Sequence, residues 1–278
     1  MEEIEYTFEC KHSECSPLLM MLPHSGRDYK DILNKQSHLP LSTLRKSEDT
    51  YLDLLFKTNT LNFNYIKANF PRILVDVNRS PLEIDAKMWK KKHAFTAHLK
   101  NSAKVDAGIG VFPKVSFSGQ KLYKNRLLFS EARRRFLRYY FPYHKKVRSF
   151  LNNIRKKHSF VIAIDCHSMS SEIVENNIDI VLSDNNGKAA DKKYIKGLKE
   201  IFNKYNYNVS INMPFKGGFT TKYYGKPDEN VHAIQIEINK KVYLIESDFM
   251  IIKNKLKKLK NCFFDIINYI NQNHVDKN

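Results

Sequence analysis

The chain has 278 residues, of which 42% are hydrophobic and 12% aromatic. This apolar content is too high for disorder to be the default state, so we expect a globular protein. Its 47 Lys and Arg against 29 Asp and Glu give a net charge of +18. Such a charge attracts nucleic acid, anionic membranes or anionic small molecules, and it does not choose among them.

The cysteines and the N-terminus indicate the compartment. Cys10, Cys15, Cys166 and Cys262 show neither the CxxC spacing of a zinc module nor the density of a disulfide scaffold, which favours reduced thiols. The first residues, MEEIEYTFECKH, are acidic and lack the apolar run of a secretory signal, and no apolar stretch is long enough to cross a bilayer. We expect a cytoplasmic protein without a membrane partner.

Short apolar runs alternate along the chain with longer segments of helical period. Several of the runs are apolar on both faces, which is typical of strands buried in the centre of a sheet. The expected strands are residues 17–22, 72–77, 160–165, 178–183 and 232–238. This alternation predicts an α/β protein with a central mixed sheet flanked by helices.

Three segments are expected to be helical. Residues 47–58 begin with a capping Ser47 and acidic first-turn residues, residues 130–157 should be interrupted near Pro142, and residues 247–271 carry an apolar stripe. Residues 85–120 are interpreted as a long active-site loop region, because loops of that length in compact domains are usually functional. No repeat or linker divides the sequence, so we expect one domain over residues 1–278.

Two expected strands end in histidine. His24 follows the run at 17–22 in the string LPHSGR, and His167 follows the run at 160–165 in the string IDCHS. Ligands of open α/β sheets bind at the carboxyl ends of strands, so neighbouring strands would bring the two imidazoles together. A single histidine at a strand end is more often structural, and the recurrence of the pattern raises the metal interpretation to an equal alternative.

A catalytic zinc ion typically has three protein ligands and a water, so two histidines leave one carboxylate to be found. Asp28 is the nearest in sequence, Glu48 and Asp49 open the following helix, and Asp165 lies beside His167. These residues leave the choice of acid open.

Two further strand segments carry polar residues with possible roles. Asn78 and Arg79 follow the run at 72–77, where the guanidinium could bind a carboxylate through two hydrogen bonds or form an ordinary ion pair. Glu237 lies between two isoleucines in an apolar strand, where an acid is costly unless it is paired or used. A carboxylate at that place could serve as the general base for an attacking water.

The string FKGGFTTKYYGKP precedes the last strand. Gly217 and Gly218 would allow a ligand to approach the backbone closely, and Lys216 suits an anion. An ordinary loop tip explains the same residues.

Taken in order, several strings resemble the N-formylglutamate amidohydrolase family, from about Pro17 to Glu246. The strings that carry the resemblance are LPHSGRDY, RKSEDTYLDLLF, FPRILVDVNRSP, GIGVFPKV, the segment 123–144 ending in YYFPYH, IDCHSMSS, and FKGGFTTKYYGKPDENVHAIQIEIN. The resemblance implies a fold similar to zinc carboxypeptidases and aspartoacylase, with one zinc ion per chain.

Carried over by matching motifs, the resemblance assigns His24 and His167 as zinc ligands and Glu237 as the base. Asn78 and Arg79 would bind a substrate carboxylate. The carboxypeptidase pattern has its acidic ligand three residues after the first histidine, where this chain has Arg27. The segment SEDTYLDLLF resembles a family motif with an acid at position 49, so Asp49 is the predicted third ligand, with Glu48 and Asp28 as alternatives.

The resemblance therefore predicts zinc-dependent hydrolysis of an N-acyl amino acid, with N-formyl-L-glutamate as the expected substrate. Lys216, Gly217 and Gly218 would bind the other carboxylate or the oxyanion. A related alternative is a deacylase or peptidase acting on another N-acyl amino acid or short peptide. A nucleic-acid-binding protein on a hydrolase fold is the lower-ranked alternative, because the sequence contains no recognised nucleic-acid motif.

Overall fold

The computed structural model of the chain describes residues 8–13, 16–30, 36–57, 62–90, 102–175 and 177–272. The chain divides into two compact units, each built from several stretches of sequence. The first comprises residues 1–9, 23–48 and 67–147, and the second comprises residues 10–22, 49–66 and 148–278. Together they form the α/β fold that the alternation of strands and helices predicts, and the single-domain organisation stays a prediction.

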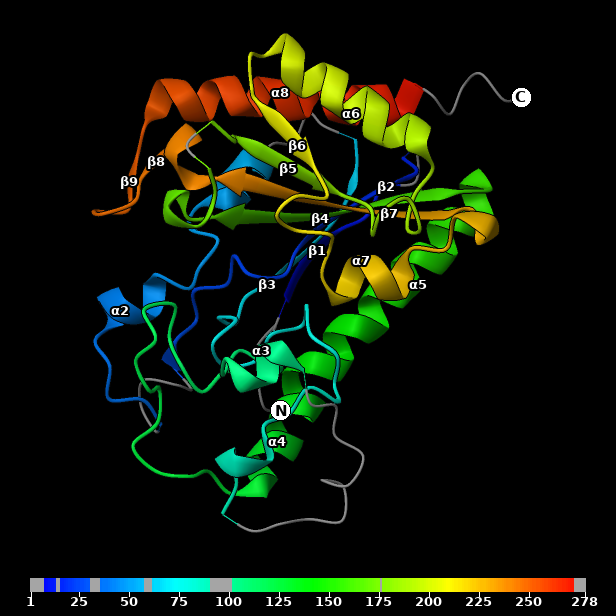
Figure 1. Cartoon of the computed structure of the whole chain (residues 1–278). Helices are drawn as coiled ribbons and strands as arrows, with labels where there is room; N and C mark the ends of the chain where they lie inside the picture. The colour runs from blue at the N-terminus through cyan, green and yellow to red at the C-terminus, as the bar shows by residue number, and fades with distance from the viewer. Residues whose placement is uncertain are drawn as a thin grey trace. The chain divides into compact units, whose positions relative to one another are not determined.

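A mixed sheet forms the centre of the second unit (Figure 1). Within the described residues it has seven strands in the spatial order β1-β3-β2-β4-β7-β5-β6, and β8 pairs with β9 in a separate two-stranded sheet. The strands are β1 (Phe8–Lys11), β2 (Leu18–Leu22), β3 (Asn64–Ala68), β4 (Val161–Met169), β5 (Ile180–Ser183), β6 (Val209–Ile211), β7 (Val231–Asn239), β8 (Leu244–Ile245) and β9 (Met250–Ile251).

The longer helices are α4 (Phe129–Arg135), α5 (Phe141–His158), α6 (Lys192–Lys204) and α8 (Lys253–Gln272). The shorter ones are α2 (Leu41–Arg45), α3 (Ala103–Asp106) and α7 (Phe219–Tyr224). Single 3₁₀ turns are η1 (Leu52–Phe56), η2 (Ala86–Met88), η5 (Ser171–Ile173), η6 (Pro227–Glu229) and η7 (Lys240–Val242), and η4 (Phe136–Tyr140) is a π-helical segment.

The register of the three central strands decides which side chains share a face. β2, β4 and β7 are parallel, with Met21 paired to Asp165 and His167 paired to Glu237. Successive residues of a strand point to opposite faces. The isoleucines at 162, 164, 234, 236 and 238 therefore point to one face, while Asp165, His167 and Glu237 point to the other.

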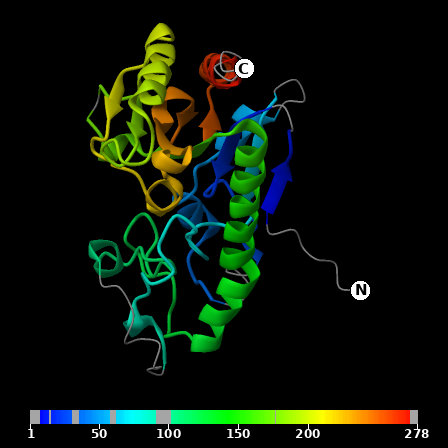
Figure 2. The same cartoon turned by 90° about the vertical axis from the view of Figure 1, so that its right-hand side faces the viewer.

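The isoleucine face forms the core of the second unit. Helices α6 and α8 cover it together (Figure 2). Buried residues of α8 pack there with Leu198 and Phe202 of α6, and they are Leu256, Leu259, Cys262, Phe263, Ile266, Ile267 and Ile270. The expected C-terminal helix is confirmed from Lys253 onward, whereas Met250 and Ile251 form β9 instead.

Four of the five expected strands form, and the prediction for residues 72–77 is wrong. This segment is a turn followed by irregular backbone, although Ile73, Leu74, Val75 and Val77 are buried. Its backbone groups bond outside any sheet ladder: Leu74 N–H donates to Pro71 O, and Asp76 N–H donates to Val111 O. A short apolar run has the same pattern in a strand and in a buried irregular segment.

The expected helix at residues 47–58 is also mostly wrong. The structure has only the 3₁₀ turn Leu52–Phe56, preceded by Tyr51 with a left-handed φ of 59°. Ser47 does not cap it, because its hydroxyl accepts a hydrogen bond from the Phe117 N–H at 3.1 Å. Residues 58–61 lie outside the described residues.

The long helical segment at residues 130–157 is confirmed, with a change at the expected break. Helices α4 and α5 are joined by the π-helical segment η4, which ends two residues before Pro142. Proline has no N–H to donate, and a π-helical turn is one way to shift the hydrogen-bond register ahead of it. Of the expected loop at residues 85–120, η2 and α3 interrupt the described part, and residues 91–101 lie outside it.

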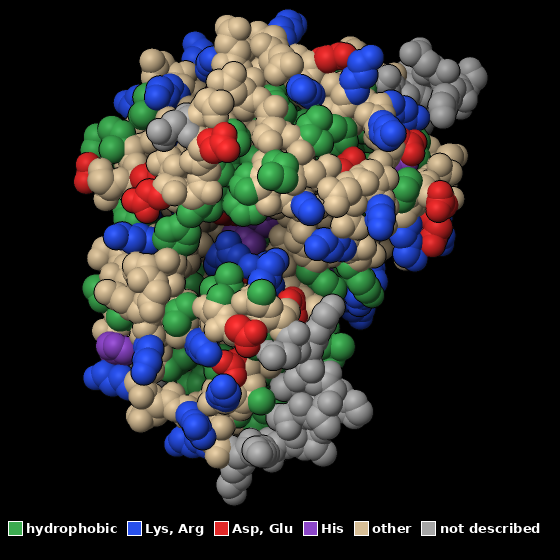
Figure 3. All heavy atoms as spheres, in the orientation of Figure 1, with side chains coloured by type: hydrophobic (Ala, Val, Ile, Leu, Met, Phe, Trp, Pro, Cys, Tyr) green, Lys and Arg blue, Asp and Glu red, His purple; other side chains and the backbone are tan. Residues whose placement is uncertain are grey.

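Two cysteines and the charged side chains of one face can be described. Cys166 and Cys262 are buried and free. Among the described residues, no helix is long and apolar enough to cross a membrane. Lys and Arg side chains are spread over the face shown in Figure 3, with acidic side chains between them.

Arg135 is a buried hub of the first unit. Its side chain is fully buried, its Nε donates to Glu131 at 2.9 Å, and its Nη1 donates to Leu74 O at 2.9 Å and to Tyr123 Oη at 3.0 Å. A further donor reaches Gln36. Burial alone raises the pKa of Glu131, but hydrogen bonds from Arg134, Gln36 and Arg135 lower it to about 2.

Replacing Arg135 by Leu should lower the free energy of unfolding by about 3–5 kcal/mol, because it leaves Glu131 and the Leu74 carbonyl without their donor. Arg134→Leu is the matched control: it removes the other arginine bound to Glu131, but that side chain is 36% exposed. Urea unfolding followed by circular dichroism measures both. Equal losses in the two variants would show that the buried hub contributes no more than a surface ion pair.

Candidate metal centre and active site

The sheet brings the ends of β2 and β4 to the same edge. Met21 of β2 is paired with Asp165 of β4, so the chain leaves β2 and reaches His24 at about the level where β4 carries His167. Pro23 follows the last strand residue and cannot donate to a sheet ladder, which suits the end of a strand. Both histidines are 2% exposed.

His24 is oriented by a buried aspartate of the first unit. Its Nε2 lies 2.7 Å from Oδ1 of Asp76, whose other oxygen accepts a hydrogen bond from Arg72 at 2.7 Å. Burial alone raises the pKa of Asp76, but Arg72, His24 and Arg79 outweigh it and hold the pKa well below its usual range. Asp76 is therefore a carboxylate that fixes the ring of His24 and leaves Nδ1 as the nitrogen for a metal.

His167 has a carboxylate at each ring nitrogen. Its Nε2 lies 3.0 Å from Asp165, and its Nδ1 lies 3.1 Å from Oδ2 of Asp49. Burial lowers the pKa of His167, but Asp165, Asp49 and Glu237 raise it well above its ordinary value. These surroundings stabilise a positive charge at the imidazole, whether a proton or a metal ion supplies it.

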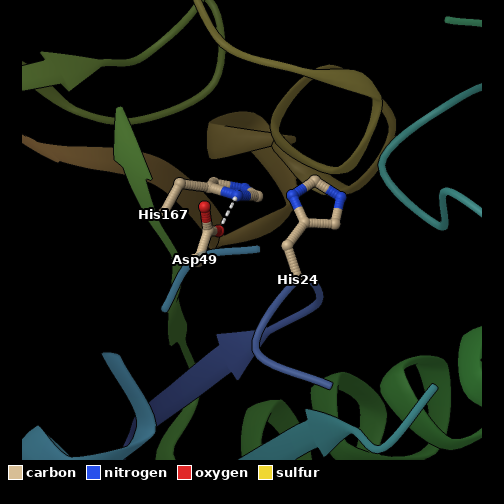
Figure 4. Close-up of side chains that lie close together, drawn as sticks. All are labelled: His24, Asp49 and His167. Carbon is tan, nitrogen blue, oxygen red and sulfur yellow. Dashed lines mark hydrogen bonds and ion pairs between the residues drawn. The ribbon is translucent and has the colours of Figure 1, made fainter. Parts of the chain in front are cut away.

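His24, Asp49 and His167 form a buried group in which one ligand atom from each residue lies within 4.8 Å of the others. In Figure 4 the two imidazoles and the carboxylate point toward one another, and the dashed line joins Asp49 to His167. The chemistry of this donor set fits zinc, because catalytic zinc sites commonly use two histidines and one carboxylate. Each imidazole also has an aspartate at its other nitrogen, where metal-binding histidines have a carboxylate, a backbone carbonyl or a water.

The alternative acids are placed differently. Glu48 accepts hydrogen bonds from Tyr29 Oη at 2.8 Å and from Arg45 Nε at 3.2 Å. Burial raises the pKa of Glu48 despite these two partners. Asp28 is exposed and accepts from the Lys30 N–H. The Asp49 carboxylate, in contrast, accepts from Ser168 Oγ at 3.2 Å and lies at His167.

Asn78 and Arg79 follow the irregular segment rather than a strand. Arg79 donates from Nε to Ile109 O and from Nη1 to Asn78 O, each at 3.0 Å, and its Nη2 lies 3.9 Å from Asp76. The segment is further fixed by Tyr140 Oη, which donates to Arg79 O at 2.8 Å. The guanidinium is thus held in a single orientation, and its role in binding a carboxylate stays a prediction.

Glu237 lies on β7 directly beside His167 in the sheet register. Its Oε1 accepts a hydrogen bond from Nε2 of Gln235 at 2.9 Å, and Oε1 of Gln235 accepts from the N–H of Gly218 at 2.6 Å. Lys216 is exposed, and Gly217 has a φ of +104°, which favours glycine. The predicted roles of Lys216, Gly217 and Gly218 in substrate binding are not decided by these contacts.

The orienting roles of Asp76, Asp165 and Gln235 were not predicted from the sequence. A signal for two of them was present. Residues two apart on a strand share a face, so Asp165 and Gln235 lie on the same face as His167 and Glu237. Asp76 gave no comparable signal, because it reaches His24 through irregular backbone.

The fold and this group of side chains define a class: an α/β protein with a candidate metal centre at the carboxyl edge of its sheet. Comparison with known proteins identifies the family. The model of the N-formylglutamate amidohydrolase family matches residues 16–244. The chain belongs to this family.

Relatives of the chain agree with that assignment. It is 26% identical over 244 residues to an N-formylglutamate deformylase of Pseudomonas putida, covering 85% of each chain, and 26% identical over 238 residues to one of Pseudomonas aeruginosa, covering 83% of each. The crystal structure of N-formylglutamate amidohydrolase from Ralstonia eutropha JMP134 superposes with a TM-score of 0.83 at 24% identity, covering 96% of this chain and 99% of that one. This last likeness confirms the expected fold class.

Asp49→Ala should weaken zinc binding by more than the roughly 10- to 100-fold typical of losing an outer-shell partner, because it removes a carboxylate from the donor set. Glu48→Gln and Asp28→Asn are the matched controls and should bind zinc as the wild type does. Competition with a fluorescent chelator measures the three affinities, with circular dichroism as the check on folding. A larger loss of zinc affinity in either control would identify Glu48 or Asp28 as the acidic ligand instead.

Proposed function

We propose that the protein hydrolyses N-formyl-L-glutamate to formate and L-glutamate with the help of one bound zinc ion. Membership of the family and the similarity to the N-formylglutamate deformylases of Pseudomonas support the substrate. The observation that carries the chemistry is the register of β4 and β7, which sets Glu237 beside His167. A candidate proton acceptor thus lies next to the His24, Asp49 and His167 group.

In this proposal His24, His167 and Asp49 would hold the zinc ion, and Asp76 and Asp165 would orient the two rings. When bound, zinc would supply Lewis acidity that lowers the pKa of water and polarises a carbonyl group. The two aspartates would accept the Nε2–H of each ring, so that Nδ1 would be the nitrogen that faces the ion.

Glu237 would carry the proton through the reaction. It accepts one proton from the attacking water as the oxygen bonds to the formyl carbon, and it gives that proton to the glutamate nitrogen as the C–N bond breaks. The products are formate and the free amino acid, so every atom of water and substrate is accounted for. The hydrogen bond from Gln235 holds the carboxylate during both steps.

Arg79 and Asn78 would bind one carboxylate of the substrate, since the guanidinium is oriented by two backbone carbonyls and its planar fork matches a carboxylate. Lys216 and the Gly217 backbone would contact the second carboxylate or the oxyanion, with Gly218 leaving space for close approach. The net charge of +18 would modestly assist the capture of a dianion. A role in amino-acid metabolism and a cytoplasmic location belong to the same proposal.

Glu237→Gln should keep zinc bound but lower kcat for N-formyl-L-glutamate by about a hundred- to ten-thousand-fold, because it removes the proton acceptor and preserves shape. Formate release measures turnover, and elemental analysis measures zinc. Wild-type protein with one zinc ion per chain and no formate release would contradict the proposed substrate. Unchanged turnover in the variant would exclude Glu237 as the base.

Arg79→Lys should lower kcat/KM for N-formyl-L-glutamate by about tenfold or more, because lysine is a point charge without the planar fork that binds a carboxylate. The loss should be much smaller for an analogue in which the bound carboxylate is an amide. Measuring both proteins on both substrates gives a cycle that separates this coupling from general damage. Equal losses of kcat/KM on the two substrates would mean that Arg79 only binds the backbone carbonyls of Asn78 and Ile109.

A further inference from the structure

Gln235 lies on the polar face of β7, two residues before Glu237. It is 4% exposed, and the register pairs it with Asp165 of β4. Its neighbours Ile234 and Ile236 point to the opposite face and belong to the hydrophobic core. Gln235 therefore lies among the site residues, and the core does not require a polar side chain at this position.

Both ends of the Gln235 amide are used, and they are used by different segments. Oε1 accepts from the N–H of Gly218 at 2.6 Å, and Nε2 donates to Oε1 of Glu237 at 2.9 Å. The opposite amide orientation would set NH₂ against the N–H of Gly218 and the carbonyl against the carboxylate, so these two partners fix the orientation. The side chain thereby links the glycine turn to the carboxylate.

The glycine turn has little freedom of its own. Gly217 has a φ of +104°, and a Cβ at this position would lie 3.0 Å from Cβ and Cγ2 of Thr221. Gly218 precedes helix α7, which packs on β7, and the first turn of α7 includes Thr220 and Thr221, both buried. Gln235 thus joins a constrained turn to Oε1 of Glu237.

We propose that Gln235 is a positioning residue that fixes the carboxylate of Glu237 and couples it to the Gly217-Gly218 turn. This inference rests on the proposed role of Glu237 as the base. The hydrogen bond on Oε1 restricts the rotation of the Glu237 carboxylate and hence the direction of Oε2. Displacements of about 1 Å in a reacting group lower rates by on the order of a hundredfold, so such a constraint is worth a measurable part of kcat. The N–H of Gly218 donates its hydrogen bond to Gln235 in this arrangement.

Two substitutions separate the two ends of the link. Gln235→Glu keeps an acceptor for the Gly218 N–H but replaces the donor to Glu237 by a repelling oxygen. Gln235→Met keeps the size and removes both hydrogen bonds. We expect Gln235→Glu to lower kcat about 10- to 100-fold with KM near wild type. Gln235→Met should lower kcat and also raise KM, because the turn that would contact substrate is no longer held.

Three measurements distinguish positioning from general damage. Ile234→Val, on the core face of the same strand, should lower the melting temperature without changing kcat or KM. The double variant Gln235→Glu with Glu237→Gln restores a hydrogen bond between the two positions with the donor reversed. Its kcat should match that of Glu237→Gln alone, because a residue that acts through Glu237 has nothing more to lose. Zinc content should equal that of the wild type throughout.

The outcomes are distinct. Wild-type kcat in Gln235→Glu, or an additive loss in the double variant, would overturn the positioning role. A fall in zinc content on Gln235→Glu would also overturn it, since the effect would then pass through Asp165 and His167. If Glu237→Gln itself retains turnover, the proposed base is wrong, and that failure is recognised without any Gln235 variant.

Discussion

Parallel pairing of β2, β4 and β7 is the constraint on which the candidate site depends. Because neighbouring parallel strands end at one edge, the pairing of Met21 with Asp165 and of His167 with Glu237 brings separate strand ends to the same level. The side-chain period of two does the rest, since it turns the isoleucines toward α6 and α8 and the polar residues toward the opposite face. A slip of one residue in β7 would exchange Glu237 for an isoleucine.

Buried charge is the second organising feature. Asp76 and Asp165 are almost fully buried, and each would be costly there without a partner. Each has an imidazole Nε2 within 3.0 Å, and Asp76 also has Arg72. The cost of burying the carboxylates is thus offset by the groups that they orient, so the stability of the region and the arrangement of the imidazoles depend on the same contacts.

Irregular backbone holds several polar residues of the first unit. The segment at residues 72–79 has no sheet partner, and side chains from α4, η4 and α5 satisfy its carbonyls: Arg135 at Leu74, His144 at Val77 and Tyr140 at Arg79. Side chains on these helical segments therefore donate the hydrogen bonds that a neighbouring strand would donate to such carbonyls in a sheet. All three side chains belong to the segment at residues 123–144, which is one of the strings that carry the family resemblance.

The sequence alone determined the fold class, the strands expected at 17–22, 160–165, 178–183 and 232–238, the C-terminal helix and the resemblance to the family, because each depends on local apolar period or on the order of short strings. It also singled out His24, His167 and Glu237, because a polar residue at the end of or within an apolar strand is costly enough to stand out. The resemblance selected Asp49 and kept Glu48 and Asp28 as alternatives, and the tertiary structure decided that the Asp49 carboxylate is the one that lies with the histidines. The neighbouring Glu48 points to Tyr29 instead. The contact of Asp76 with His24 was likewise decided by the tertiary structure, because it joins distant segments through irregular backbone. For Gln235 the strand period indicates the shared face, and only the tertiary structure shows its contact with the Gly218 N–H.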